Sequence, residues 1–465
     1  MTPLWLSMLA CTAYAQAPLT CETAVVGGGW AGVYAAWRLT VDAQAVEPSS
    51  LCLFEARSAV GGRTYSVVVD DLKIDIGAYR FGKEMHLPGD LILHRFNMTT
   101  ACYEPDCAPD PEMKQRLYKI VDEHGHNAGY SAPIFRMLGE MIAVGVRVFY
   151  EHFLTGIYSD VAVPGGSQLH FAGGAVASAK RVLLNLPRGA MERLDPQSSV
   201  FPASDQRGWS LLRNCTPCGD VITSNVKVYA IYDDPWWVTK LNLTEGLFTS
   251  VDLDPPLVGR YHDGPVLHSA SGEAIGPGAL EAVYTFSSQH PQISYYHPFA
   301  PLMAVDPLSI TTDPALLVPL HQRLMDFHAK AFAAVGLNAS TIPQMTRVVL
   351  GVWTTDKLAT LPAPASSNFH AQVGDACPAE LCLKGVSPEE YNEAISSPNA
   401  MANIHVANND FAYTGDQGVP CCWAEQSLKP VERTLHKVWG LDKPQWLDST
   451  YYAELIGPGS AAVVI

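Results

Sequence analysis

Charged residues are scarce in this chain, and basic residues are the scarcest. Asp, Glu, Lys and Arg make up 16% of the 465 residues, against about 25% in an average soluble protein. Lys and Arg number 30 against 46 Asp and Glu, so the net charge is −16. A surface of that sign repels phosphate backbones, which excludes nucleic acid as an expected partner.

Long hydrophobic runs and sequence repeats are also missing. The longest uncharged stretch beyond the N-terminus, residues 161–179, is interrupted by Pro164 and four glycines, so no membrane span is expected. Heptads, collagen triplets and fixed-period repeats are absent, which excludes fibres and solenoids. The chain has apolar content instead. Hydrophobic residues make up 48% of it, enough for a large core, and its length corresponds to about three domains.

The N-terminus has the pattern of a targeting segment. Residues 1–15 carry no charge and end in Ala13-Tyr14-Ala15. A short apolar stretch closed by A-x-A is typical of a secretory signal peptide, which predicts cleavage after Ala15 and a secreted, extracellular protein. The alternative is an uncleaved, partly buried arm that leads into the first strand.

Cysteine usage agrees with secretion, because ten cysteines remain after that cleavage and an even number fits an oxidising compartment. We expect local disulfides between Cys102 and Cys107 and between Cys377 and Cys382. A structural bridge is also expected at the C-x-x-C of residues 215–218, whereas Cys52, inside an apolar strand, is predicted to be a buried thiol. Four N-x-S/T sequons support glycosylation, starting at Asn97, Asn214, Asn242 and Asn338.

Residues 23–39 predict a dinucleotide site. An apolar strand-like run leads into Gly27-x-Gly29-x-x-Gly32 and then into an apolar helical stripe. The three glycines allow a tight turn, close approach of a pyrophosphate, and packing of helix on strand. A second apolar run ends in Glu55, where a carboxylate can accept hydrogen bonds from ribose hydroxyls. The alternative is a glycine-rich turn followed by an incidental acid.

The residues that start at Glu55 restrict the choice of cofactor. Glu55-Ala56-Arg57 is followed after three residues by Gly61-Gly62-Arg63, and this string resembles the second fingerprint of the flavin-containing amine oxidase superfamily. The resemblance implies FAD rather than NAD, with Arg63 neutralising the phosphates. It also implies an α/β fold in which a discontinuous FAD-binding Rossmann-like domain of glutathione-reductase type joins a mixed-sheet substrate domain.

Within that superfamily, residues 74–81 resemble the segment of L-amino-acid oxidases that lines the flavin ring. Gly77, Ala78, Tyr79 and Arg80 stand at its centre, with Tyr79 in place of the usual Met. The resemblance implies that Arg80 pairs with the substrate carboxylate, since a planar guanidinium orients an amino acid for transfer of its Cα hydrogen. The alternative is that Arg80 is a second phosphate-binding or structural arginine.

Further matches carry other expected roles. Leu154 stands where the family places a backbone contact to adenine, Lys227 where an inward lysine holds a water near the flavin, and Tyr284 where a hydroxyl meets the substrate carboxylate. The alternatives are an exposed lysine of an alternating strand and a core tyrosine. Trp353 resembles a structural or site-wall aromatic of the same family.

Residues 411–427 resemble the closing FAD motif, with departures. Asp416 replaces Glu, Cys422 replaces the Gly before Trp423, and Pro430 falls in the helix that should follow. The resemblance implies that Cys422 offers its carbonyl to the substrate amine. The full set of expected cofactor contacts is Gly27, Gly29, Trp30, Ala31, Gly32, Glu55, Ala56, Arg57, Gly62, Arg63, Gly77, Ala78, Tyr79, Arg80, Leu154, Asp416, Trp423 and Ala424.

The largest departure from the family is an absence. Family members insert a long helical region after the arginine segment, and here residues 83–128 leave room only for a shortened one. The expected FAD-binding domain comprises residues 16–82, 129–219 and 401–465, and the substrate domain comprises residues 220–400.

These matches predict oxidative deamination of L-amino acids to 2-oxo acids, with O₂ as oxidant and release of ammonia and hydrogen peroxide. No metal is expected, and a homodimer stays open. The alternatives are a monoamine or polyamine oxidase, and a secreted flavin-binding protein without turnover.

Overall fold

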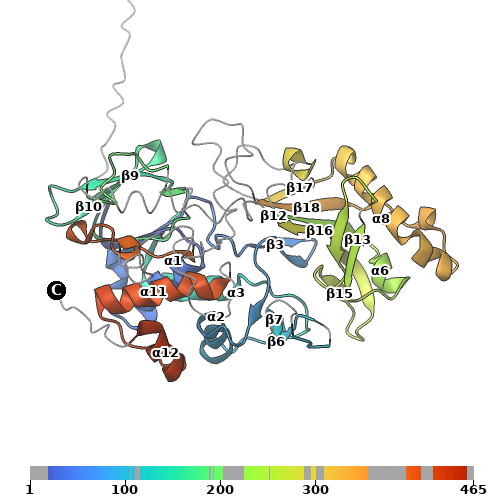
Figure 1. Ribbon diagram of the computed structural model, residues 1–465, viewed down its shortest axis with the longest axis horizontal. Helices are drawn as coiled ribbons and strands as arrows, with labels where there is room; N and C mark the ends of the chain where they lie inside the picture. The colour runs from blue at the N-terminus through green and yellow to red at the C-terminus, as the bar shows by residue number, and fades with distance from the viewer. Residues whose placement is uncertain are drawn as a thin grey trace, which may run out of the picture.

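The computed structural model describes residues 19–104, 106–109, 116–187, 190–191, 193–202, 225–250, 252–286, 295–299, 308–353, 394–409 and 423–457. The predicted signal peptide, the cysteines at 215, 218, 377, 382, 421 and 422, and Asp416 lie outside these residues. Figure 1 shows two lobes side by side, each built around one sheet.

The first lobe holds a mixed sheet. Its strands lie in the order β8 (Arg147–Phe149), β2 (Leu51–Phe54), β1 (Leu19–Val26), β11 (Val176–Leu184), β10 (Ser167–Phe171) and β9 (Leu154–Ser159), and β19 (Ile404–Val406) also pairs with β11. The pairs that β1 forms with β2 and β11 are parallel, while β10 is antiparallel to both β9 and β11. Parallel neighbours need a crossover, and the predicted helix provides it as α1 (Trp30–Trp37) between β1 and β2.

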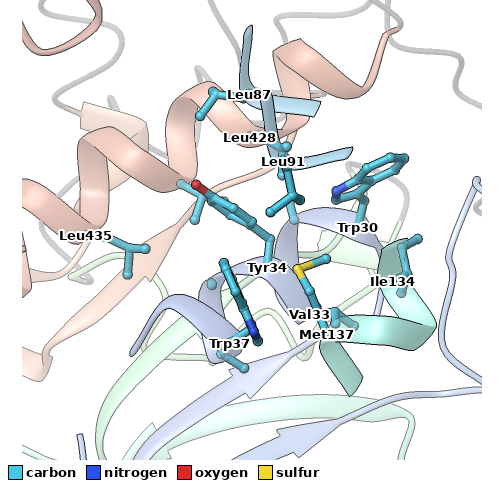
Figure 2. Packing of buried hydrophobic residues seen from close by; sticks show 14 of the residues in the cluster. Trp30, Val33, Tyr34, Trp37, Leu87, Leu91, Ile134, Met137, Leu428 and Leu435 are labelled. Carbon is cyan, nitrogen blue, oxygen red and sulfur yellow. The ribbon is translucent and has the colours of Figure 1, made fainter. Parts of the chain in front are cut away.

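Helix α1 is buried along its whole length, and its neighbours explain why. Around it lie α3 (Ala132–Val144) and α11 (Ala424–Trp439), with α12 (Ser449–Ile456) next to α11. Figure 2 shows Val33, Tyr34 and Trp37 of α1 packed between side chains of these elements. A buried Glu432 of α11 accepts hydrogen bonds from the Tyr34 hydroxyl at 2.6 Å and from Arg38 Nε at 2.7 Å. Helix α11 runs through Pro430 without ending.

The second lobe holds the predicted substrate sheet. Its strands lie in the order β13 (Leu247–Ser250), β14 (Leu257–Arg260), β16 (Ala274–Phe286), β12 (Asn225–Tyr232), β18 (Arg347–Trp353) and β17 (Leu308–Thr311), and β15 (Val266–His268) also pairs with β16. Helix α8 (Pro314–Ala334) packs on one face through Leu316, Leu320, Leu324 and Phe332. The fold class is confirmed. In one detail the expectation was wrong: the described pairs of this sheet are all antiparallel rather than mixed.

The opposite face of the second sheet receives a hairpin from the first third of the chain. Strands β3 (Ser66–Val69) and β4 (Leu72–Asp75) pack there against Tyr229 and Ile231 of β12. The chain thus runs directly from the dinucleotide fingerprints to the face of the second sheet.

The region expected to be a shortened helical region, residues 83–128, is helical only at its start. Helix α2 (His86–Asp90) and a π-helical turn (Leu91–Arg95) are followed by β6 (Thr100–Cys102) and β7 (Leu117–Ile120), which form a small sheet with β5 (Phe81–Gly82). No helix in the described part of the chain is long and apolar enough to cross a membrane.

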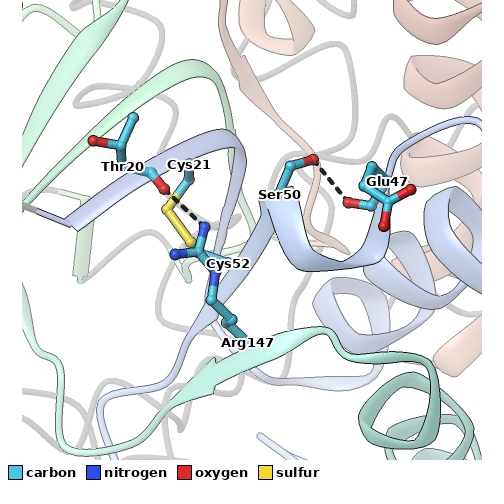
Figure 3. The surroundings of a disulfide bond; sticks show 6 residues. All are labelled: Thr20, Cys21, Glu47, Ser50, Cys52 and Arg147. Carbon is cyan, nitrogen blue, oxygen red and sulfur yellow. Dashed lines mark hydrogen bonds between the residues drawn. A yellow bond between two sulfur atoms is a disulfide. The ribbon is translucent and has the colours of Figure 1, made fainter.

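Two disulfides are present among the described cysteines. The predicted Cys102–Cys107 bridge is confirmed. The interpretation of Cys52 as a buried thiol was wrong, because it is bonded to Cys21 across the neighbouring strands β1 and β2 (Figure 3). An apolar strand can place a cysteine beside a partner that local sequence does not reveal. The asparagines of three sequons, Asn97, Asn242 and Asn338, are exposed, and glycosylation stays a prediction.

Candidate active site

The loop after β1 has the geometry that its glycine spacing predicts. Gly27 has a φ of +101°, and a Cβ there would lie 2.3 Å from the carbonyl oxygen of Asn185. A Cβ on Gly32 would lie 1.9 Å from the carbonyl oxygen of Gly27. Neither position can accept a side chain without moving backbone. The loop therefore passes closely under the start of α1, where a dinucleotide's pyrophosphate binds in this type of fold.

The second fingerprint folds directly onto the first. The amide of Gly61 donates to the carbonyl oxygen of Gly28 at 2.8 Å, and a Cβ on Gly62 would lie 2.8 Å from the Cα of Gly29. Glu55 is buried at the end of β2, and its carboxylate accepts hydrogen bonds from the amides of Gly28 at 2.6 Å and Arg57 at 2.9 Å. Two stretches about thirty residues apart thus form one cradle.

The arginines of this cradle have different tasks. Arg57 donates to the carbonyl oxygen of Gly62 at 3.2 Å and lies over the ring of Tyr65 at 4.7 Å, so it holds the turn in shape. Arg63 donates to the side-chain oxygens of Asn408, at 3.1 Å, and of Asn409. Arg63 thereby joins the cradle to the segment that follows β19.

A pocket of about 890 Å³, part of it open to solvent, lies at this cradle. The expected cofactor contacts among its lining residues are Gly27, Gly29, Trp30, Ala31, Glu55, Ala56, Arg57, Gly62, Arg63 and Leu154. Gly32 lies against Gly27 beneath it. His152, Phe153 and Asn185 also line the pocket and were not anticipated. A glycine cradle with a carboxylate at one strand end and Leu154 in the wall fits the adenosine and pyrophosphate half of FAD.

Residues 75–77 connect the cradle to the second sheet. Each of their three consecutive carbonyl oxygens accepts a hydrogen bond from a side chain of that sheet. Lys227 Nζ donates to the carbonyl oxygens of Asp75 at 3.1 Å and Gly77 at 2.7 Å. The indole nitrogen of Trp353 donates to the carbonyl oxygen of Ile76 at 2.8 Å. A Cβ on Gly77 would lie 2.1 Å from the carbonyl oxygen of Arg63, so this segment touches the fingerprint on its other side. Ala78 follows and is exposed.

Lys227 lies inside the protein rather than on its surface. Its side chain is 2% exposed, which rules out the alternative of a solvent-facing lysine. Its ammonium group lies 3.6 Å from the centre of the Tyr79 ring and 5.1 Å from that of Tyr284, which pairs with Lys227 across β12 and β16. Burial lowers the pKa of Lys227 to about 8, because a charged amine is poorly solvated there.

Arg80 is surrounded by aromatic rings. Its guanidinium carbon lies 4.6 Å from the ring centre of Tyr103, 5.2 Å from that of Tyr79 and 5.6 Å from that of Trp423. Trp423 precedes α11, which begins at Ala424, so part of the C-terminal motif does reach this cluster. Cys422 lies outside the described residues, as Asp416 does.

Next to Tyr79 and Tyr284 lies a group of ionisable side chains that includes Asp263 and Glu281. A β-bulge places Glu281 opposite Tyr229 while Tyr284 stays opposite Lys227, so both side chains reach the same face. Burial raises the pKa of the Glu281 carboxyl well above its usual range, and the neighbouring Asp263 adds to this rise. The pKa of Asp263 is lowered by His262 and Arg260 despite its burial. Burial thus favours the neutral form of Glu281, while His262 and Arg260 favour the anionic form of Asp263.

Sequence reasoning missed Tyr103, Arg260, Asp263 and Glu281. Glu281 had a signal, because it is a lone acid in an otherwise apolar and aromatic strand. Tyr103 had none: it follows Cys102 in the segment where the family pattern is lost, and only the fold brings its ring to Arg80.

Comparisons with known proteins agree with this architecture. Residues 25–86 match the family model of the NAD(P)-binding Rossmann-like domain. No curated protein sequence matches the chain. Among solved structures, wild-type putrescine oxidase bound to putrescine is 13% identical, with a TM-score of 0.51 over 91% of this chain and 100% of that one. A triple mutant of putrescine oxidase from a redesign of its cofactor binding is 12% identical over the same shares, with a TM-score of 0.52.

At these identities the comparison shows the fold. The chain has a Rossmann-like dinucleotide-binding domain, and its fold is similar to that of putrescine oxidase over nearly its whole length. The fold and the residues of the cradle together support FAD as the cofactor.

Proposed function

We propose that the protein is an FAD-dependent L-amino-acid oxidase. It converts an L-amino acid, O₂ and water into a 2-oxo acid, ammonia and hydrogen peroxide. The observation that carries the proposal is Arg80, held among aromatic rings beside Lys227 at the end of the segment that leads from the dinucleotide cradle. The glycine loops, Glu55, Arg63 and Leu154 would hold FAD, which supplies the acceptor for the Cα hydrogen and its two electrons when bound.

The charge of the site favours a substrate with a carboxylate. Arg80, Arg260 and the ammonium of Lys227 are cationic and Asp263 is anionic, while burial raises the pKa of the Glu281 and Asp75 carboxyls and so favours their neutral forms. A cluster with surplus positive charge, inside a protein of net charge −16, attracts an anionic group and repels a second ammonium. A planar guanidinium with two parallel N–H groups matches a carboxylate in shape as well as in charge.

The other side chains have roles that follow from this placement. The Tyr284 hydroxyl lies near enough to Arg80 to interact with its charge and would donate to the carboxylate of a bound substrate. Lys227, fixed by two carbonyl oxygens, holds a water at the reacting end of the substrate. Its pKa near 8 lets it release a proton at mildly alkaline pH.

The second candidate is an oxidase of amines that lack a carboxylate. The two solved structures described above are of putrescine oxidase, and one contains putrescine. A diamine would bring a second cation next to Arg80 and Arg260 without a carboxylate to compensate, so the charge of the site favours the amino acid.

Secretion belongs to the same proposal. The Cys21–Cys52 and Cys102–Cys107 disulfides support maturation in an oxidising compartment, as the signal-like N-terminus predicts.

The experiment begins with the flavin spectrum of the purified protein and a peroxide assay on the twenty amino acids and their decarboxylated amines. Under the proposal at least one amino acid is oxidised faster than its amine. Replacing Arg80→Gln should then lower kcat/KM for that amino acid by about 100-fold, leave the ratio of flavin to protein unchanged, and affect the amine far less. Peroxide from amines alone would establish the second candidate. A yellow protein that releases no peroxide from any substrate would contradict both.

A further inference from the structure

Tyr103 comes from the part of the chain that the family pattern does not cover, yet it lies at the centre of the site. Its side chain is 2% exposed. One neighbour of its ring is the Arg80 guanidinium at 4.6 Å, and another is the His262 ring, which meets it edge-on at 5.0 Å. Among the three rings around Arg80, this one is the nearest.

Polar contacts fix the tip of this ring to the second lobe. The Tyr103 hydroxyl donates to Asp263 Oδ2 at 2.6 Å and accepts from Arg260 Nη1 at 3.2 Å. Arg260 ends β14, and Asp263 follows in the next turn. The Tyr79 hydroxyl lies 3.4 Å away as a further, weaker partner. Because a hydroxyl has one proton, and Asp263 accepts it in the shortest of these contacts, the tip of the ring is held in a defined direction.

The base of the ring is equally well fixed. The amide of Tyr103 donates to the carbonyl oxygen of Leu117 at 2.8 Å, next to the β6–β7 ladder. The preceding residue, Cys102, is bonded to Cys107. A ring held at both ends is a rigid platform, whereas an arginine side chain has several rotatable bonds and loses freedom when it must keep one geometry.

We propose that Tyr103 is a positioning residue that holds the Arg80 guanidinium in the orientation required to bind a carboxylate. The inference rests on the proposed function, in which Arg80 receives the substrate carboxylate, and extends it to a residue outside the family's motifs. In this role Tyr103 acts through Arg80. Replacing Tyr103 leaves the charge of Arg80 intact, but the orientation of the guanidinium is no longer fixed.

Two variants of Tyr103 separate the contributions of the ring and the hydroxyl. Tyr103→Leu removes the platform, and Tyr103→Phe keeps the ring but breaks the bonds to Asp263 and Arg260. The matched control is Tyr118→Leu, because Tyr118 belongs to the same small sheet and its ring also lies under a cation, the Lys83 ammonium at 4.0 Å.

The test is calorimetric titration of the flavin-loaded protein with benzoate and with benzamide, which has the same ring and no charge. We expect wild-type protein to bind benzoate more tightly than benzamide. Tyr103→Leu should weaken benzoate binding about tenfold, because the cation–π contact is lost, and Tyr103→Phe about threefold, because the hydrogen bonds of the hydroxyl are lost. Benzamide affinity should stay unchanged in both, and Tyr118→Leu should match wild type. With amino-acid substrates, KM should rise while kcat stays within twofold.

Several outcomes would overturn the proposal. These are equal weakening of both probes, unchanged benzoate affinity in Tyr103→Leu, or no preference of the wild type for benzoate. If Tyr103→Leu does not fold, Tyr103→Phe decides alone, and unchanged benzoate affinity in that variant overturns the proposal. The proposed function fails separately: a wild-type protein that binds benzoate selectively but oxidises no amino acid keeps Tyr103 in this role without that activity.

Discussion

The dinucleotide cradle and the cluster around Arg80 present different kinds of atoms to a ligand. The cradle is built of backbone from a few short stretches, and at Gly27, Gly32 and Gly62 neighbouring backbone leaves no space for a Cβ. The cluster is built of long side chains that arrive from distant segments, including Arg80, Tyr103, Lys227, Tyr284 and Trp423.

This difference determines what each region tolerates. Added atoms disturb the cradle because backbone lies on both sides of its glycines, whereas the cluster depends on the charge and shape of each side chain. The cradle should therefore fail through steric substitutions and the cluster through substitutions that keep volume and change chemistry.

The most far-reaching effect is expected from one added methyl group in the cradle, because it removes the cofactor on which the cluster depends. Gly32→Ala places a Cβ 1.9 Å from the carbonyl oxygen of Gly27, which forces the loop and α1 apart. We expect the purified variant to retain less than about a tenth of the wild-type flavin, because separating packed backbone costs at least ~1–3 kcal/mol. The ratio of flavin to protein absorbance measures this.

The matched control is another glycine. Gly139 lies exposed within α3 and has no atom within 4 Å of an added Cβ, so Gly139→Ala should keep its flavin and gain about 0.5–1 kcal/mol of stability. Full flavin retention by Gly32→Ala would contradict the close approach of the loop.

The next effect is expected in the cluster, from a substitution that keeps the length of the side chain. Lys227→Met keeps the volume and removes the amine, so we expect flavin to stay bound while kcat falls on the order of 100-fold. Stopped-flow reduction of the flavin under anaerobic conditions measures the loss directly. A variant that reduces its flavin at the wild-type rate would show that Lys227 is only structural.

The same residue gives a pH dependence of stability. Its pKa is about 8 in the folded protein and about 10.4 in an unfolded chain. Between these values the unfolded state binds more protons, so this contribution to the free energy of unfolding rises with pH, by about 1.4 kcal/mol per unit. The difference in Tm between wild type and Lys227→Met, measured at each pH, isolates the contribution of Lys227. A difference that stays flat from pH 8 to pH 10 would contradict the lowered pKa.

The smallest effect is expected from Tyr284→Phe. The ring that meets Tyr79 edge-on at 5.7 Å stays in place, and only the hydroxyl is lost. We expect KM for the preferred amino acid to rise about threefold to tenfold, as for one hydrogen bond to a charged group, with kcat unchanged. Steady-state peroxide release measures both constants. An equal rise of KM for the decarboxylated amine would place the hydroxyl away from the carboxylate.

The sequence predicted the cradle well because its rules are local. Glycine spacing, the acid at the end of β2 and the second glycine pair follow one another within forty residues, and their geometry depends on turns and close backbone contacts. Lys227, Arg80 and Tyr284 could be named from family motifs, and the structure brings them together. The positions of Tyr103 and Asp263 could not be predicted, because each depends on how two lobes meet. The partner of Cys52 depends on strand pairing in the same way.

The Cys21–Cys52 disulfide makes the first β-α-β unit of the cradle a covalently closed ring. The bond spans 31 residues and in the chain-entropy model contributes about 3.7 kcal/mol to stability. A protease cut between these cysteines would leave both fragments joined, and the protein would migrate as one band until a reductant is added. The nucleotide-binding unit is thus protected against the loss of either strand after a single backbone break.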